Sequence, residues 1–310
     1  MRPNVELGYD KPLYLLAFDH RGSFEKDLFH ASPPISDEVR AGISDVKSLI
    51  FEGFELAIAR GAPRDAAGVL VDEEFGAAVA RRAIAAGYAL AMPVERSGQA
   101  EFDFEYGEDF ASHIEAFDPT FTKVLVRYNP EGDAELNGRQ TERLARLSGW
   151  LHGHGRRFLY ELLVPATAEQ LGRCGGDQNR YDAEIRPALV VETIRSQQDD
   201  GVEPDIWKIE GLDTETDCAR IVAQATAGGR DRVVCIVLGR GVTEERLLDW
   251  LRVAAAVPGF DGFAVGRTLW EEALQGFLAG RATRGQTAAT IADRYLETVH
   301  GYLGPPRQDS

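Results

Sequence analysis

The chain has 310 residues, of which 44% are hydrophobic, and a formal net charge of −16. Its length is somewhat above the roughly 250 residues typical of a one-domain α/β barrel. The excess of negative charge argues against a nucleic-acid or an anionic-membrane partner, because both bind clustered positive charge. A phosphate ligand stays compatible with this composition, since a pocket can be basic locally.

Short apolar or β-branched runs alternate with longer amphipathic stretches, and no linker divides the chain. The runs predicted as strands span 13–18, 68–71, 88–93, 121–126, 157–163, 205–209, 233–238 and 262–265. Helical patterns between them span 36–60, 76–86, 134–153, 181–201, 214–227 and 243–256. Strands that alternate with helices in this way predict an α/β fold, a single-domain (β/α)8 TIM barrel over 13–303. An extension (1–12) would precede it and a tail (304–310) would follow.

Polar residues stand at the carboxyl ends of the predicted strands, the face where barrel enzymes carry their active sites. In strand order they are Asp19 and Arg21, Asp72, Glu95, Lys123 and Arg127, Glu161, Lys208, Gly239 and Arg240, and Gly266 and Arg267. Because the strand ends meet at one face of a barrel, we expect these groups to converge there.

Lys208 lies in the strand PDIWKIE (204–210), with apolar neighbours on both sides. A charged lysine in a barrel interior is costly unless paired, and burial lowers its pKa towards the free amine that attacks a ketone. Lys123, in FTKVLVR (121–127), has similar surroundings and shares a face with Arg127. If both lysines point inward, each should lower the pKa of the other. For either one, a salt bridge at a strand end is the alternative interpretation.

Glu161 is the lone carboxylate in the apolar strand FLYELL (158–163). Its strand separates those of Lys123 and Lys208, so Glu161 should lie between the two lysines. A carboxylate there could relay protons in carbonyl chemistry. It could equally form a structural ion pair, and the sequence leaves both roles open.

The segments Gly239-Arg240-Gly241 and Gly266-Arg267-Thr268 follow the last two predicted strands. Loops at these places commonly bind phosphate in barrels, through backbone N–H groups and a helix N-terminus. Arginine adds bidentate contacts to phosphate oxygens. We therefore expect a small sugar phosphate as ligand.

Five motifs occur in a characteristic order: LAFDHRGS (16–23), VDEEFG (71–76), YEL (160–162), WKIE (207–210) and GFAVGRT (262–268). Together they resemble the class I tagatose-bisphosphate aldolase-like barrels. The middle and C-terminal parts are more similar still to the aldolase-like barrel known as domain of unknown function 2090. That barrel is fused to 5-dehydro-2-deoxygluconokinase in bacterial inositol catabolism.

The resemblance implies a carbon–carbon lyase in which Lys208 forms the Schiff base and Glu161 is the acid and base. It places Asp19, Arg21 and Lys123 around the substrate, with Gly239 and the Gly266-Arg267 turn at a phosphate. The substrate would be a phosphorylated keto sugar or keto sugar acid, cleaved to dihydroxyacetone phosphate and an aldehyde. No cofactor is needed beyond the covalent lysine imine. A polar insertion at 172–181 and Arg240, where the tagatose-type enzymes carry a small residue, depart from the family pattern.

We thus assign Lys208, Glu161 and Lys123 as catalytic. The substrate-binding assignments are Asp19, Arg21, Asp72, Arg127, Gly239, Arg240, Gly266 and Arg267, and no metal ligand is assigned. One alternative is a metal-dependent aldolase or isomerase, with hard oxygen ligands from Asp72, Glu73 and Glu74 and with His20. Another is a barrel that binds a phosphosugar without turning it over. The sequence is also compatible with a homo-oligomer.

Cysteine usage and hydropathy bear on the compartment. Cys174, Cys218 and Cys235 form neither a disulfide framework nor a metal-binding spacing, which favours a reducing compartment. The first residues, MRPNVELGYDKP, lack the apolar core of a signal peptide, and no apolar run approaches the ~20 residues of a membrane span. We expect a cytoplasmic protein without a membrane partner.

Overall fold

The computed structural model describes residues 6–239 and 241–304. Eight parallel strands close into one barrel in chain order, which confirms the predicted (β/α)8 fold. The strands are β1 (Leu13–Ala17), β2 (Ala67–Leu70), β3 (Ala89–Pro93), β4 (Phe121–Arg127), β5 (Arg157–Leu163), β6 (Ile206–Glu210), β7 (Val234–Leu238) and β8 (Phe260–Val265).

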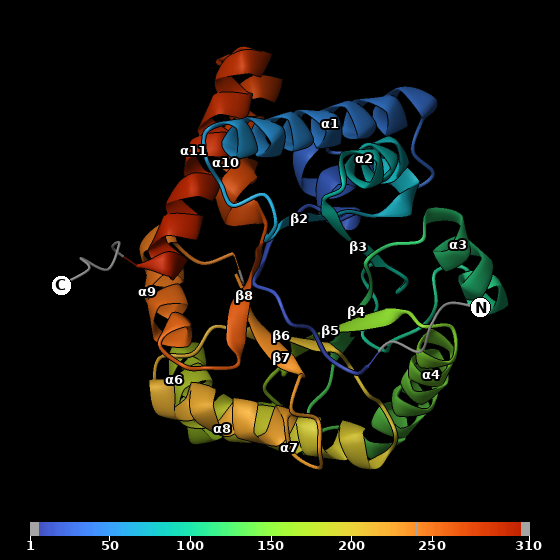
Figure 1. Cartoon of the computed structure of the whole chain (residues 1–310), viewed down its shortest axis with the longest axis vertical. Helices are drawn as coiled ribbons and strands as arrows, with labels where there is room; N and C mark the ends of the chain where they lie inside the picture. Colours follow the sequence, from blue (N-terminus) through green and yellow to red (C-terminus); the bar gives the residue numbers. More distant parts are fainter. Residues whose placement is uncertain (1–5, 240, 305–310) are drawn as a thin grey trace.

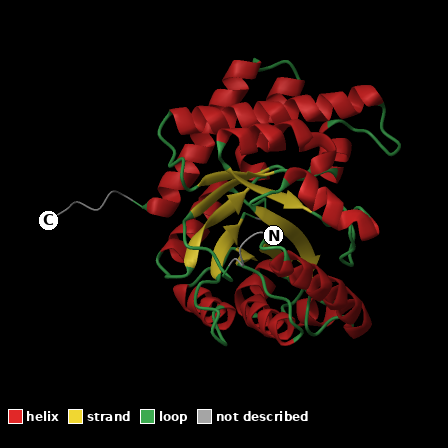
Figure 2. Cartoon of the chain, turned by 45° about the vertical axis from the view of Figure 1, so that its right-hand side comes forward, coloured by secondary structure: helices red, strands yellow, loops and turns green. Residues whose placement is uncertain are grey.

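Helices surround the barrel on the outside, as the two overall views show (Figures 1 and 2). They are η1 (Phe24–Leu28), α1 (Asp37–Ala59), α2 (Glu73–Ala86), η2 (Gly107–Asp109), α3 (Phe110–Phe117), α4 (Ala134–Gly153), α5 (Ala168–Arg173), α6 (Gln178–Glu184), α7 (Arg186–Asp199), α8 (Glu215–Ala225), α9 (Glu244–Ala255), α10 (Arg267–Leu278) and α11 (Arg284–Leu303). The long α11, which follows α10, packs against α1, α9 and α10. Within the described ranges, none of these helices has the length and apolar character that crossing a membrane requires.

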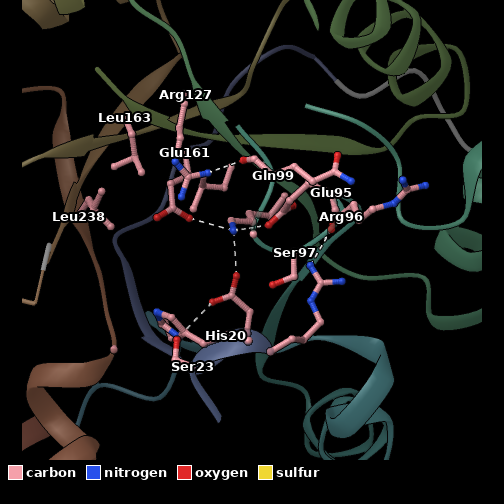
Figure 3. A pocket seen from close by; sticks show the side chains of 18 of the residues that line it. His20, Ser23, Glu95, Arg96, Ser97, Gln99, Arg127, Glu161, Leu163 and Leu238 are labelled. Atoms are coloured by element: carbon pink, nitrogen blue, oxygen red, sulfur yellow. Dashed lines mark hydrogen bonds and ion pairs between the residues drawn. The ribbon is translucent and has the colours of Figure 1, made fainter. Parts of the chain in front are cut away.

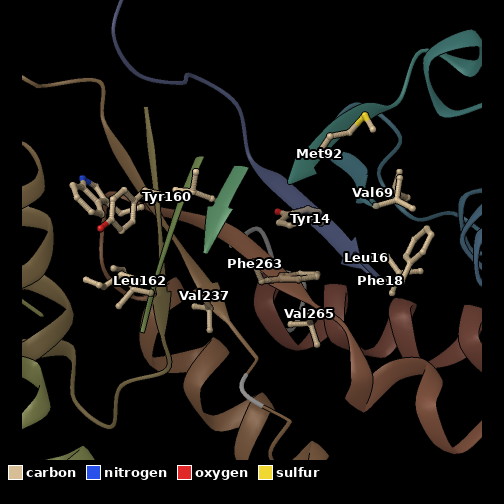
Figure 4. Packing of buried hydrophobic residues seen from close by; sticks show 14 of the residues in the cluster. Tyr14, Leu16, Phe18, Val69, Met92, Tyr160, Leu162, Val237, Phe263 and Val265 are labelled. Carbon is tan, nitrogen blue, oxygen red and sulfur yellow. The ribbon is translucent and has the colours of Figure 1, made fainter. Parts of the chain in front are cut away.

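Side chains alternate between two cores because successive strand residues point to opposite faces. The inner core fills the barrel below its carboxyl end with Leu13, Leu15, Ala17, Leu70, Ala91, Phe121, Leu159, Ile206, Val234, Ile236 and Ala264. The outer core lies between strands and helices and includes Tyr14, Leu16, Val69, Tyr160, Val237 and Phe263 (Figure 4). The apolar inner layers leave the carboxyl end as the place for charged side chains.

Two of the predicted helices differ from the structure by three residues or more, each for a local reason. The helix predicted over 181–201 is divided at Ile185, because Pro187 in the first turn of α7 has no N–H to continue the ladder from α6. Helix α2 begins three residues earlier than predicted, at Glu73. Asp72 is its N-cap, and the Asp72 carboxylate accepts a hydrogen bond from the Phe75 N–H.

Candidate active site

A cavity of about 440 Å³ opens at the carboxyl ends of the strands. This volume is in the range of small-molecule sites. Nine of the eleven predicted site residues line it: Asp19, Arg21, Lys123, Arg127, Glu161, Lys208, Gly239, Gly266 and Arg267. Asp72 lies elsewhere, and Arg240 falls outside the described residues.

Lys123 is the centre of an ionic cluster at the bottom of this cavity. Its Nζ lies 2.7 Å from Glu95 Oε1, 2.8 Å from Asp19 Oδ2 and 3.0 Å from Glu161 Oε2. In Figure 3, dashed lines run from Glu161 and Glu95 to this nitrogen. The Lys123 side chain is only 1% exposed, so the three carboxylates take the place of water around the ammonium group.

Lys208 joins the cluster from the neighbouring strand. Glu161 of β5 and Lys208 of β6 are register partners, and Lys208 Nζ lies 3.0 Å from Glu161 Oε2. The same Glu161 oxygen is therefore shared between Lys208 and Lys123. Within ion-pair distance, Lys208 has this one carboxylate among the described residues, whereas Lys123 has three. The two lysines thus have different electrostatic surroundings.

The pKa of Lys123 contradicts the expectation that two inward lysines would lower each other's pKa. Burial alone would lower the pKa of Lys123. The negative charges of Asp19, Glu161 and Glu95 outweigh this effect and raise the pKa well above its ordinary value. Lys123 is therefore a fixed cation at neutral pH.

The pKa values of Asp19 and Glu161 move in the opposite direction. Burial disfavours the charged forms of both groups, but nearby positive charge outweighs this effect. The pKa of Asp19 is lowered by Lys123, then by His20 and Lys208. The pKa of Glu161 is lowered by Lys123 and then by Lys208. Both groups are carboxylates at neutral pH. Glu161 is thus an ionised acceptor directly beside the Lys208 Nζ.

These shifts predict a dependence of stability on pH. The folded-state pKa of Asp19 lies below its unfolded value of about 3.9, so its stabilising contribution is present above about pH 4 and is lost as the pH falls further. For Lys123 the folded-state pKa is raised, so its contribution is present below about pH 10 and is lost as the pH rises through the folded-state value.

We expect urea denaturation of the Asp19→Asn variant to show a shallower loss of unfolding free energy below pH 4 than the wild type shows. Replacement of the exposed Asp231 by Asn is the matched control and should keep the wild-type slope. Equal acid slopes for Asp19→Asn and the wild type would contradict the pairing of Asp19 with Lys123.

Asp72 was predicted to bind substrate, and its position contradicts this. Its carboxylate is fully buried, caps α2, and pairs with the equally buried Lys47 of α1. The Asp-Glu-Glu run after β2 is therefore a capped helix start with acidic residues in its first turn, an arrangement that the helix dipole favours.

Arg21, after β1, and Arg127, on β4, both line the cavity. Arg21 is buried and donates to the backbone carbonyl of Glu95 at 2.6 Å and to the Glu105 carboxylate at 2.9 Å. Arg127 donates through Nη1 to the Gln99 carbonyl at 2.8 Å (Figure 3). Both arginines thus hold the segment after β3 over the cavity.

Gly239, after β7, and Gly266 and Arg267, after β8, also line the cavity. Gly266 is the N-cap of α10, and a Cβ there would approach the Ala17 carbonyl oxygen to 2.3 Å, so only glycine fits. The Arg267 guanidinium lies beside Gly241 and has no carboxylate partner within the described part of the chain. The first N–H groups of an α-helix have no partner within the helix, so the start of α10 and this arginine are suited to an anion.

Two further groups at the site, Glu95 and His20, were not among the catalytic and substrate-binding assignments. Glu95 binds Lys123, and burial raises its pKa although Lys123 and Arg21 oppose the effect. His20 lines the cavity with its Nδ1 buried and without a hydrogen bond in the described structure. Burial lowers the pKa of His20 to about 4, so the ring is neutral at pH 7. The polar ends of the first and third strands were the available signal.

The ligands suggested for a metal site are engaged separately. Asp72 pairs with Lys47, Glu73 with His113, and Glu74 with Arg40. Across residues 6–239 and 241–304, His, Cys, Asp and Glu side chains do not form a group of three or more that could hold a metal ion. The geometry therefore gives no support to the metal-dependent alternative.

Fold and site together define a single-domain (β/α)8 barrel with a lysine–carboxylate cluster at its carboxyl end. The chain belongs to the family described as uncharacterized protein conserved in bacteria (DUF2090), whose model matches residues 6–303. A crystal structure of Cgl0159 from Corynebacterium glutamicum (Brevibacterium flavum) is similar, with a TM-score of 0.59 at 17% sequence identity. The match covers 96% of this chain and 88% of that chain, and it supports the fold. No curated protein matches.

Proposed function

We propose that the protein is a class I aldolase that cleaves a phosphorylated keto sugar or keto sugar acid through a Schiff base on Lys208. The observation that carries the proposal is the Glu161 oxygen that lies 3.0 Å from the Nζ atoms of both Lys208 and Lys123. The resemblance to tagatose-bisphosphate aldolase-like barrels supports the same assignment. Barrels of this kind are commonly enzymes with the active site at this face.

The difference between the two lysines gives each a role. Lys123, held charged by three carboxylates, cannot serve as the nucleophile at neutral pH. Lys208 can transfer a proton to Glu161 and attack the ketone as the free amine. The permanent charge of Lys123 keeps Glu161 oriented and stabilises the oxyanion that forms at the carbonyl.

The reaction would proceed in four steps. Lys208 Nζ adds to the carbonyl carbon, and loss of water with a proton from Glu161 gives the iminium. Glu161 then removes the proton of the hydroxyl group two carbons from the iminium carbon. The carbon–carbon bond breaks, an aldehyde leaves, and the electron pair moves to the iminium nitrogen as an enamine. Protonation and hydrolysis release dihydroxyacetone phosphate and restore Lys208, without a further cofactor.

The phosphate would bind between Gly239 and the Gly266-Arg267 turn, with Asp19, Arg21 and Arg127 around the rest of the substrate. The glycines leave room for phosphate oxygens to approach backbone N–H groups, and Arg267 supplies the positive charge. A net negative protein needs such a local cation to attract an anionic substrate.

The direct test is intact-mass spectrometry after borohydride treatment with dihydroxyacetone phosphate. We expect one adduct with the mass of the ligand less one water plus two hydrogens, and peptide mapping should place it on Lys208. Binding of the ligand without an adduct would favour a phosphosugar-binding barrel. The same experiment with a panel of ketose phosphates and phosphorylated keto sugar acids would then show which compounds form a trapped imine, and the substrate would be sought among these.

Glu161→Gln is expected to lower kcat by about 10²- to 10⁴-fold, because general acid–base catalysis contributes on this order. KM should change little, since Glu161 is not placed at the phosphate. Steady-state kinetics with the substrate that forms the borohydride-trapped adduct would measure both kcat and KM. Glu108→Gln, a change at an exposed helix-start carboxylate, is the control. An unchanged kcat for Glu161→Gln would remove Glu161 from the mechanism.

A further inference from the structure

A second buried ion pair lies outside the cavity, directly behind the turn that carries Asp19. Lys47 Nζ donates to the carbonyl oxygen of Phe18 at 2.7 Å, to that of His20 at 2.9 Å, and to the Asp72 carboxylate. An ammonium group has three N–H donors, so these bonds satisfy all of them. Lys47 and Asp72 are both 0% exposed.

The two carbonyl groups belong to the residues on either side of Asp19. Lys47 therefore fixes the Phe18–Asp19 and His20–Arg21 peptide units, one on each side of the Asp19–His20 pair, from the side of α1. On the cavity side, the Asp19 carboxylate meets Lys123 Nζ at 2.8 Å. The turn is held between two lysines. Lys47 binds its backbone carbonyls, and Lys123 binds the side chain of Asp19.

Burial of a charged pair is costly compared with an apolar contact of the same size. Helix α1 already contributes apolar residues to the core, among them Phe51 and Phe54, so packing does not require a lysine at position 47. An apolar residue at position 47 could not donate hydrogen bonds to the two backbone carbonyls that follow β1, where the hydrogen bonds between strands end.

We propose that Lys47 is a positioning residue that holds Asp19 against Lys123 and so keeps Lys123 protonated, which leaves Lys208 as the attacking amine. The last clause rests on the proposed aldolase function. The effect on Asp19 and Lys123 does not, and it can be measured without any substrate.

The test compares Lys47→Met/Asp72→Asn with Asp72→Asn alone. Asparagine keeps the N-cap of α2, and the double change avoids an unpaired buried carboxylate. In the single variant we expect Lys47 to retain its bonds to both carbonyls. The single variant is therefore a matched control for loss of the ion pair without loss of the backbone contacts.

The first readout is the rate of acetylation of Lys123 by acetic anhydride between pH 7 and 10, mapped by mass spectrometry, with the exposed Lys11 and Lys26 as internal references. We expect a rise of about tenfold or more relative to Lys11 in the double variant, the effect of one pKa unit. Asp72→Asn alone should label like the wild type. Equal labelling of Lys123 in all three proteins, or an equal rise in both variants, would overturn the proposal.

The second readout is the rate of borohydride trapping with dihydroxyacetone phosphate in a double-mutant cycle with Asp19→Asn. If Lys47 acts through Asp19, Lys47→Met/Asp72→Asn should slow trapping in the wild-type background and add little in the Asp19→Asn background. Additive losses would overturn the proposal. A wild-type protein that traps nothing would reject the aldolase function, and the acetylation result would still decide the role of Lys47.

Discussion

Lys208→Met is expected to abolish imine trapping and to lower the rate of substrate cleavage by roughly 10⁴-fold or more, the scale seen when a covalent nucleophile is removed. Lys123 should not substitute for it, because three carboxylates hold Lys123 charged. The protein should stay folded, since Glu161 keeps Lys123 as its partner. Methionine also fills most of the space that the lysine stem occupied.

Mass spectrometry after borohydride treatment measures this result, with circular dichroism to confirm folding. Lys11→Met, a change at an exposed lysine outside the cavity, is the matched control and should trap like the wild type. An adduct that persists in Lys208→Met and maps to Lys123 would reverse the assignment of the two lysines.

Lys123→Met should have the largest effect on stability, a loss of about 3–5 kcal/mol in the free energy of unfolding. Removal of one partner from a buried ion pair typically costs this much, because the remaining charge is left uncompensated. Here three carboxylates, those of Asp19, Glu95 and Glu161, would repel one another in a poorly solvated site.

Urea denaturation at pH 7 and at pH 4 tests this prediction. The loss should be smaller at pH 4, where the carboxylates can take up protons, and Glu95→Gln in the Lys123→Met background should restore part of it. Lys26→Met, at an exposed lysine of the cavity mouth, should leave stability close to that of the wild type. A Lys123→Met variant with wild-type stability at both pH values would show that the cluster is not held by Lys123.

The site differs from a simple pair of active-site lysines in how charge is distributed. Two lysines and three carboxylates share the inner end of the cavity, and the uneven pairing separates a fixed cation, Lys123, from a candidate nucleophile, Lys208. Such pairs of titratable groups in contrasting environments are how one site can hold both an acid and a base at the same pH. The buried Lys47–Asp72 pair extends the network to α1 and α2.

Periodicity and strand-end chemistry were sufficient to predict the barrel and most of its cavity. Apolar runs of strand length alternate with amphipathic helices throughout, and a parallel barrel brings all carboxyl ends to one face whatever the details of the loops. For that reason Lys123, Glu161 and Lys208 could be placed together from strand order alone. The alternation of side chains along each strand then gave their inward direction.

The tertiary structure decided what each charged group does. Asp72 follows the end of its strand, as the residues that line the cavity do. Its side chain instead pairs with Lys47, which is 25 residues away along the chain. The pKa of Lys123 depends on carboxylates from the turn after β1, from β5 and from the segment after β3, and these distances follow from the closure of the barrel. A sequence specifies which strand ends carry charge, whereas the pairing of those charges depends on side-chain geometry between strands that are remote in sequence.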